Sequence, residues 1–206
     1  MSGFTLQEMM LHGWPVISVL LIMSIYSFAI IVDRVLTLRR AQMNSRAFVA
    51  DVVKLIDAEG VPKAVEHCRK TKKPLASVVA AILEQPGKRE RKKQALQNAL
   101  QEQISELELR VPSLGTIAST APFVGLLGTV IGIIRAFRDI AMNVGGGPEV
   151  VSAGIAEALI TTAFGLFVAI PAAFAFNWCV NRIRRLAREI DLASYVIVEK
   201  VSGEDE

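Results

Sequence analysis

Three long apolar runs constrain this chain more than any other feature of its sequence. They cover residues 15–32, 111–134 and 150–180, and a single acid, Glu157, interrupts the last of them. About 20 consecutive apolar residues are enough to cross a bilayer as a helix, so each run can span a membrane. Yet 21% of all residues are charged. The sequence therefore predicts an all-α integral membrane protein with three transmembrane helices and long helical extensions in water.

The distribution of lysine and arginine predicts the orientation of the spans. Residues 33–112 hold 16 of these 23 residues and residues 181–206 hold five. Positive residues accumulate on the cytoplasmic side, so we expect the N-terminus outside and the C-terminus inside. The first run is expected to be an uncleaved anchor rather than a signal peptide, because no lysine or arginine precedes it. The predicted segments are an outer N-terminus (1–13), spans at 14–33, 111–136 and 150–180, a cytoplasmic helical domain (34–110), an outer hairpin (137–149) and a cytoplasmic C-terminal helix and tail (181–206).

The predicted cytoplasmic domain reads as several helices. Ser45 is expected to cap the first of them. The last is expected to start near Lys88 and to run into the second span, with a kink at Pro112. The basic run 88–93 has no aromatic residues interleaved. We therefore expect a solvated helix face near anionic lipid, and no nucleic acid.

No residue pattern indicates a cofactor, a metal or catalysis. The chain has no glycine-rich phosphate loop and no HExxH motif. Cys68, Cys179, His12 and His67 are isolated, which predicts free thiols and no metal site. No nucleophile and base are recognisable as a pair, so we expect no enzyme.

Small residues mark the second and third spans as helices built for protein contact. Such residues let helices approach closely in a membrane. Pro122 and Pro171 lie inside the two spans and are predicted to kink them. Besides these two prolines, the predicted packing residues are Gly125, Gly128 and Gly132 in the second span, and Gly154, Ala158 and Gly165 in the third.

Glu157 is the candidate functional residue. A carboxylate at mid-bilayer costs roughly 2.5–3.5 kcal/mol, and it can be charged in a wet environment and neutral in a dry one, as a proton relay requires. The alternative is an acid that simply faces the outer interface. A hairpin centred at 142–143 would bring Glu157 level with Thr129. Thr161 lies about 40° from Glu157 around the helix and Thr162 about 140°, so Glu157 and Thr162 are expected on different faces.

Two segments carry a resemblance to a known family. IASTAPFVGLLGTVIGI (117–133) and GIAEALITTAFGLFVAIPA (154–172) resemble the signature of the ExbB/TolQ/MotA proton-channel family, most closely ExbB. The resemblance implies a homo-pentamer in the bacterial inner membrane around a dimer of a single-span ExbD-like protein. Proton flow would then energise a TonB-like protein. In a TolQ-type subunit it would instead serve envelope integrity and division. It also implies that the family's acid falls on Glu157 and its pore threonines on Thr129 and Thr162, with Thr161 beside them.

A membrane scaffold that conducts nothing is the competing hypothesis. It accounts for the small residues without a role for Glu157. A neighbouring gene for a one-span protein with an aspartate in its span would favour the channel subunit, and the absence of such a gene would favour the scaffold.

Overall fold

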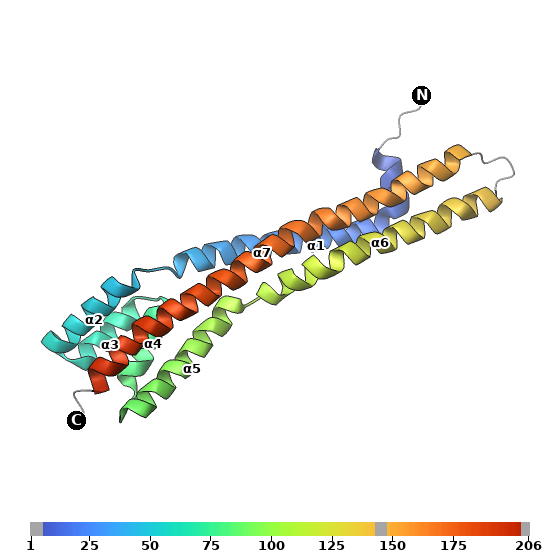
Figure 1. Ribbon diagram of the computed structural model, residues 1–206. Coiled ribbons are helices and arrows are strands. Elements are labelled where there is room, and N and C mark those ends of the chain that lie inside the picture. Colours follow the sequence, from blue (N-terminus) through green and yellow to red (C-terminus); the bar gives the residue numbers. More distant parts are fainter. Residues whose placement is uncertain (1–5, 143–147, 203–206) are drawn as a thin grey trace. The chain divides into compact units, whose positions relative to one another are not determined.

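The computed structural model describes residues 6–142 and 148–202 and is helical throughout this part of the chain (Figure 1). The chain divides into two compact units, one of residues 1–32 with 110–177 and one of residues 33–109 with 178–206. The helices of the described residues are α1 (Leu6–Arg40), α2 (Ser45–Glu59), α3 (Val61–Lys70), α4 (Pro74–Glu84), α5 (Arg89–Glu108), α6 (Val111–Met142) and α7 (Pro148–Ser202).

The first unit contains the apolar parts of α1, α6 and α7. These three helices are long and apolar enough to cross a membrane, which confirms the predicted number of spans. Their mutual core is small, and large apolar side chains remain exposed along all three helices. Phe174 is 75% exposed and Phe123 70% exposed. In water such surfaces would be unfavourable, so they fit lipid or other membrane chains. The buried core consists of Leu20, Ile117, Ala121, Val168, Ala169 and Ala172.

The helices of the spans are longer than the apolar runs. Helix α1 extends on both sides of the predicted span 14–33. Helix α7 continues without a break from Pro148 to Ser202, past the predicted end of its span at residue 180. Both Pro122 and Pro171 lie inside continuous helices, so neither ends its helix. The predicted outer hairpin falls partly on residues 143–147, which lie outside the described residues.

The second unit is a helical bundle around an apolar core. Helices α2, α3, α4 and α5 pack in chain order, and the last turns of α7 complete the core with Ile190, Ile197, Val198 and Val201. Helix α2 is capped by Asn44, whose Oδ1 accepts a hydrogen bond from the Ala47 amide at 3.2 Å. The prediction of Ser45 as this cap was wrong by one residue. Asn and Ser are about equally good caps, so the sequence could not separate them.

The predicted continuous helix from α5 into α6 was also wrong. Helix α5 ends at Glu108 and α6 begins at Val111. Arg110 between them has a φ of +65°, the left-handed region that a non-glycine residue rarely adopts. Pro112 therefore lies in the first turn of α6, where a proline costs little, and not at a kink.

Candidate functional site

Glycines set the contact between α6 and α7. A Cβ at Gly125 would lie 2.8 Å from the backbone oxygen of Thr161 and 3.0 Å from the Cα of Thr162. A Cβ at Gly165 would lie 2.7 Å from the Ala121 oxygen. Real Cβ atoms do not approach backbone this closely, and backbone cannot give way as a side chain can. These two positions therefore exclude any larger residue while the helices keep this contact.

The remaining small residues extend the same contact along both helices. A Cβ at Gly132 would meet Ala158 Cβ at 2.7 Å, and one at Gly154 would meet Ala136 Cβ at 2.6 Å. A Cβ at Gly128 would collide with the hydroxyl of Thr161 and lie 3.0 Å from Val16 of α1. The five glycines and the alanine among the predicted packing residues thus lie in one antiparallel seam within the chain.

Thr129 and Thr162 face each other across this seam. Their hydroxyl oxygens are 3.4 Å apart. The Thr129 hydroxyl also lies 2.6 Å from the Leu126 carbonyl oxygen, and a carbonyl can only accept. The proton of Thr129 is therefore directed to Leu126, and the Thr162 hydroxyl is the donor in the threonine pair. Thr162 keeps a lone pair on its own oxygen with which to accept a further hydrogen bond.

Thr161 lies inside the seam. Only 3% of the residue is exposed. Its hydroxyl oxygen is 2.7 Å from the Ala158 carbonyl on its own helix and 3.1 Å from the Gly125 carbonyl on α6. This geometry joins the two helices. A role for Thr161 in a proton pathway stays a prediction.

Glu157 lies more than one helical turn away from the threonine pair. Ala158 packs against Gly132, whereas Thr129 is opposite Thr162. The prediction that Glu157 and Thr129 share one depth was therefore wrong by four to five residues, roughly 6–7.5 Å along the helix. Counting residues from the middle of a hairpin ignores the glycine contacts, which set the actual register.

The carboxylate of Glu157 is incompletely satisfied. Its Oε1 is buried and has no hydrogen-bond partner among the residues that the structure describes. A buried polar oxygen without a partner is unfavourable by about 1–3 kcal/mol, and by more if it is charged. The described residues thus leave this oxygen without a donor.

The basic run is largely used inside the second unit. The Arg89 guanidinium lies 3.0 Å from both the Tyr195 hydroxyl and a Glu199 carboxylate oxygen. The Lys92 ammonium is buried and donates to the Val201 carbonyl at 3.1 Å. Lys93 pairs with Glu90 at 2.9 Å. Only the rest of the run remains available to lipid, and that contact stays a prediction.

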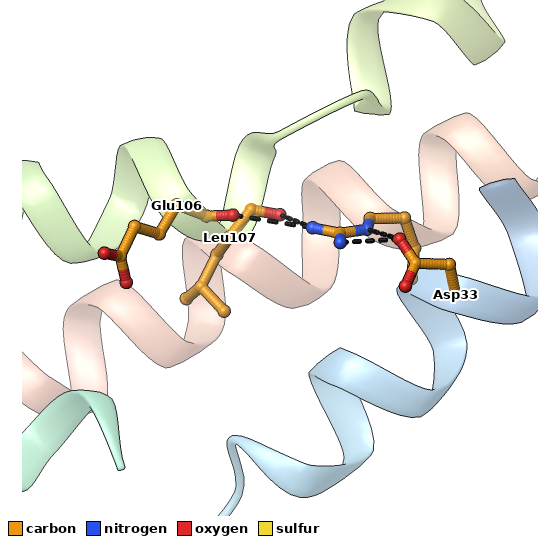
Figure 2. Close-up of polar contacts among 4 residues, drawn as sticks. Asp33, Glu106 and Leu107 are labelled. Atoms are coloured by element: carbon orange, nitrogen blue, oxygen red, sulfur yellow. Dashed lines mark hydrogen bonds and ion pairs between the residues drawn. The ribbon is translucent and has the colours of Figure 1, made fainter. Parts of the chain in front are cut away.

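The sequence analysis missed Arg34. Its side chain is 7% exposed and lies 2.7 Å from the Asp33 carboxylate (Figure 2). Its other amino group lies 3.4 Å from the Glu106 and Leu107 carbonyl oxygens, at the C-terminal end of α5. A cation there offsets the negative end of the helix dipole. The sequence signals a charge after the first span, but not the helix end that receives it.

No metal centre is formed by the described side chains. Across residues 6–142 and 148–202, no group of three or more His, Cys, Asp or Glu residues is placed to hold a metal ion.

Comparison with known proteins relates this chain to membrane proton channels. Residues 70–192 match the MotA/TolQ/ExbB proton channel family. The biopolymer transport protein ExbB of Neisseria meningitidis serogroup A is 30% identical over 195 residues, which cover 85% of this chain and 86% of that protein. The Tol-Pal system protein TolQ of Haemophilus influenzae is 44% identical over 95 residues, 46% of this chain and 42% of that relative. This second match thus spans less than half of the relative's length.

A solved structure shares the fold. The C. jejuni MotAB structure aligns with a TM-score of 0.55 and 19% identity, covering 88% of this chain and 72% of that one. At this identity the likeness concerns the fold alone. The family match covers more than half of the chain, and the ExbB match extends along most of it. The chain belongs to the MotA/TolQ/ExbB proton channel family.

Proposed function

We propose that this chain is the channel subunit of a proton-driven motor in the bacterial inner membrane. Copies of the chain form a homo-pentamer around a dimer of a single-span, ExbD-like protein. Protons moving down their gradient drive that partner, which energises a TonB-like protein and transport across the outer membrane. In this role the chain is not an enzyme and needs no cofactor. Family membership and the match to an ExbB over 85% of the chain support this assignment.

One observation carries the proposal. Glu157 is the one charged residue of the apolar run 150–180, and its buried carboxylate oxygen Oε1 has no hydrogen-bond partner among the described residues. A proton, or a donor from the partner helices, would satisfy this oxygen. The Thr162 oxygen, which can accept a hydrogen bond, lies five residues further along α7, about 1.4 turns. A unit charge that crosses 100 mV releases about 2.3 kcal/mol, so each proton supplies a modest and usable step.

The test replaces these groups in the full chain, expressed with its partner proteins. We expect Glu157→Ala, and Thr129→Ala combined with Thr162→Ala, to lower proton-dependent uptake of iron complexes at least about tenfold, because both remove polar groups that the pathway needs. The complex should still co-purify. Thr116→Ala is the matched control, since that hydroxyl bonds only its own helix, at Pro112. Normal uptake with either of the first two variants would refute the proposal.

A TolQ-type role is the second candidate. The local identity to the Haemophilus influenzae TolQ, 44%, exceeds the 30% identity to the Neisseria meningitidis ExbB. Expression in strains that lack either an ExbB or a TolQ separates the two roles. Restored iron-complex uptake supports the first, and restored resistance to detergents supports the second.

A further inference from the structure

We propose that a second copy of this chain docks on the cytoplasmic part of α7 through opposite charges on α5. The inference rests on the proposed function, which makes the chain one subunit of a ring. It names the surfaces that meet: Arg185 and Arg188 of one copy, and Glu102 and Glu106 of its neighbour.

The first surface is an exposed stripe on α7. Arg185, Arg188, Leu192 and Tyr195 follow one another at spacings of three and four residues, so they share one face of the helix. All of them are exposed, and Leu192 is 72% exposed. The opposite face of α7 is buried through Ile183, Leu186 and Ile190. We call this set of four residues the α7 stripe. It combines two positive charges with the exposed side chain of Leu192 and with Tyr195, whose ring lies 6.0 Å from the Arg89 guanidinium of the same chain.

The second surface is a flank of α5. Glu102 and Glu106 are four residues apart on α5 and are exposed, and Leu109, directly after the end of the helix, is 57% exposed. We call these three residues the α5 flank. Glu108 is also exposed, but it lies about 120° around the helix from Glu102. The α5 flank therefore matches the α7 stripe in composition, with two charges of the opposite sign and an apolar side chain.

The two surfaces lie at the same level of the second unit. Lys92 contacts the Val201 carbonyl, and Arg89 contacts Glu199, so the start of α5 lies at the end of α7 and the helices run in opposite directions. Glu106 follows Lys92 by 14 residues and Ala187 precedes Val201 by 14 residues. With the same rise per residue in both helices, Glu106 and the Arg185–Arg188 turn come level.

None of the ion pairs among the described residues involves the charges at this level. Near the end of α7, opposite charges on the two helices meet, as Arg89 and Glu199 do at 3.0 Å. At the level of Glu106 and the Arg185–Arg188 turn, none of the described contacts joins Glu102 or Glu106 to an arginine. Neither Arg185 nor Arg188 has an ion-pair partner among these contacts. The α5 flank and the α7 stripe thus face away from each other in one copy.

A second copy of the chain fits this arrangement better than another occupant. A neighbour in the same membrane stands at the same height, so its α5 flank meets the α7 stripe without any vertical shift. Contacts between two different surfaces of identical chains propagate from copy to copy and close into a ring when the rotation allows. Exposed ion pairs contribute little by themselves. The exposed Leu192 and Leu109 supply the apolar area, and the charges fix the pairing of the surfaces.

Disulfide cross-linking in native membranes tests the pairing. We expect Glu106→Cys combined with Arg185→Cys in the full chain to give a ladder of covalent multimers after mild oxidation. Cys68 and Cys179 are buried and should not contribute. The matched control is Glu108→Cys with Arg185→Cys, which should stay monomeric. Multimers of equal yield from the control, or none from the first pair, would overturn the proposal.

Charge reversal supplies the second arm, read out as the mass of the complex in native mass spectrometry. Arg185→Glu with Arg188→Glu, or Glu102→Arg with Glu106→Arg, should lower the fraction of assembled rings by about tenfold or more, because like charges then face each other. All four changes together should restore assembly. If the arginines instead bind anionic lipid, the glutamate variants would assemble normally and the combination would not rescue, which contradicts the proposal.

These outcomes are separable from a failure of the proposed function. A cross-linked ladder with normal uptake in Glu157→Ala would leave the interface standing and remove the channel role. Lost uptake in Glu157→Ala, with no cross-linked ladder from the cysteine pair, would support the channel role and remove the interface.

Discussion

Cys68 shows how burial decides the chemistry of a single side chain. The residue is 2% exposed, in the core of the second unit. Burial, and next the nearby Glu84 carboxylate, raise the pKa of its thiol to about 11. Only the thiolate reacts with electrophiles, so this thiol should be inert. Because of this shift, the folded protein binds the thiol proton more tightly than the unfolded chain does. The contribution of Cys68 to stability therefore falls as the pH rises from 9 towards 11.

Thiol labelling checks this expectation. In a Cys179→Ser background, maleimide at pH 8 should modify native Cys68 roughly a hundredfold more slowly than an exposed cysteine, since a pKa two units higher lowers the thiolate fraction by that factor. Rapid modification should appear once the protein is unfolded in detergent. Fast labelling of the folded protein would show that the core opens readily.

At the residue level, composition alone was enough to single out some side chains, whereas side chains defined by a distant partner could not be recognised. Glu157 was identifiable as the one acid of its apolar run. That Thr129 faces Thr162 rather than Glu157 depends on the glycine contacts, which no local pattern in the sequence reports. The buried side chain of Arg34 was unpredictable for the same reason, because the two carbonyl groups that it contacts lie more than 70 residues away along the chain.

At the level of elements, the α6–α7 seam is the most demanding feature. We expect Gly125→Ala to destabilise the protein by about 1–3 kcal/mol, the usual effect of forcing a methyl group into a packed interface. The methyl would meet backbone at 2.8 Å, which cannot move aside. Thermal unfolding of the protein in mild detergent measures the effect.

Gly115→Ala is the control for this prediction. Its added methyl would meet the ring of Phe176 at 3.1 Å, and a side chain can shift by a few tenths of an ångström. A loss in Gly115→Ala as large as in Gly125→Ala would mean that the seam is not specially tight.

Hydropathy predicted the three spans because length and apolarity are summed over many residues. Helix ends were less predictable, since they depend on single contacts. The break between α5 and α6 is an example. Leu107 and Val111 continue the helical spacing of apolar residues, so the pattern favours one helix. In the structure both are buried, while Arg34 reaches the last carbonyls of α5 and Arg110 takes a positive φ.

For the whole molecule, charge distribution predicts an orientation that can be tested directly. We expect green fluorescent protein fused after Glu206 to fluoresce, because this domain folds in the cytoplasm, where 21 of the 23 lysines and arginines are expected to lie. A fusion after Arg138, which leaves only two spans, should stay dark. Fluorescence in the second fusion and none in the first would invert the predicted topology.

The glycine seam also has a consequence for biogenesis. Neither α6 nor α7 is an ideal membrane segment on its own, since each carries several glycines and hydroxyls and α7 carries an acid. Packed together, they cover these groups with each other and turn outward the phenylalanines and leucines that lipid accepts. We therefore expect α6 to stay near the translocon until α7 has been synthesised, and the two helices to enter the bilayer as a pair.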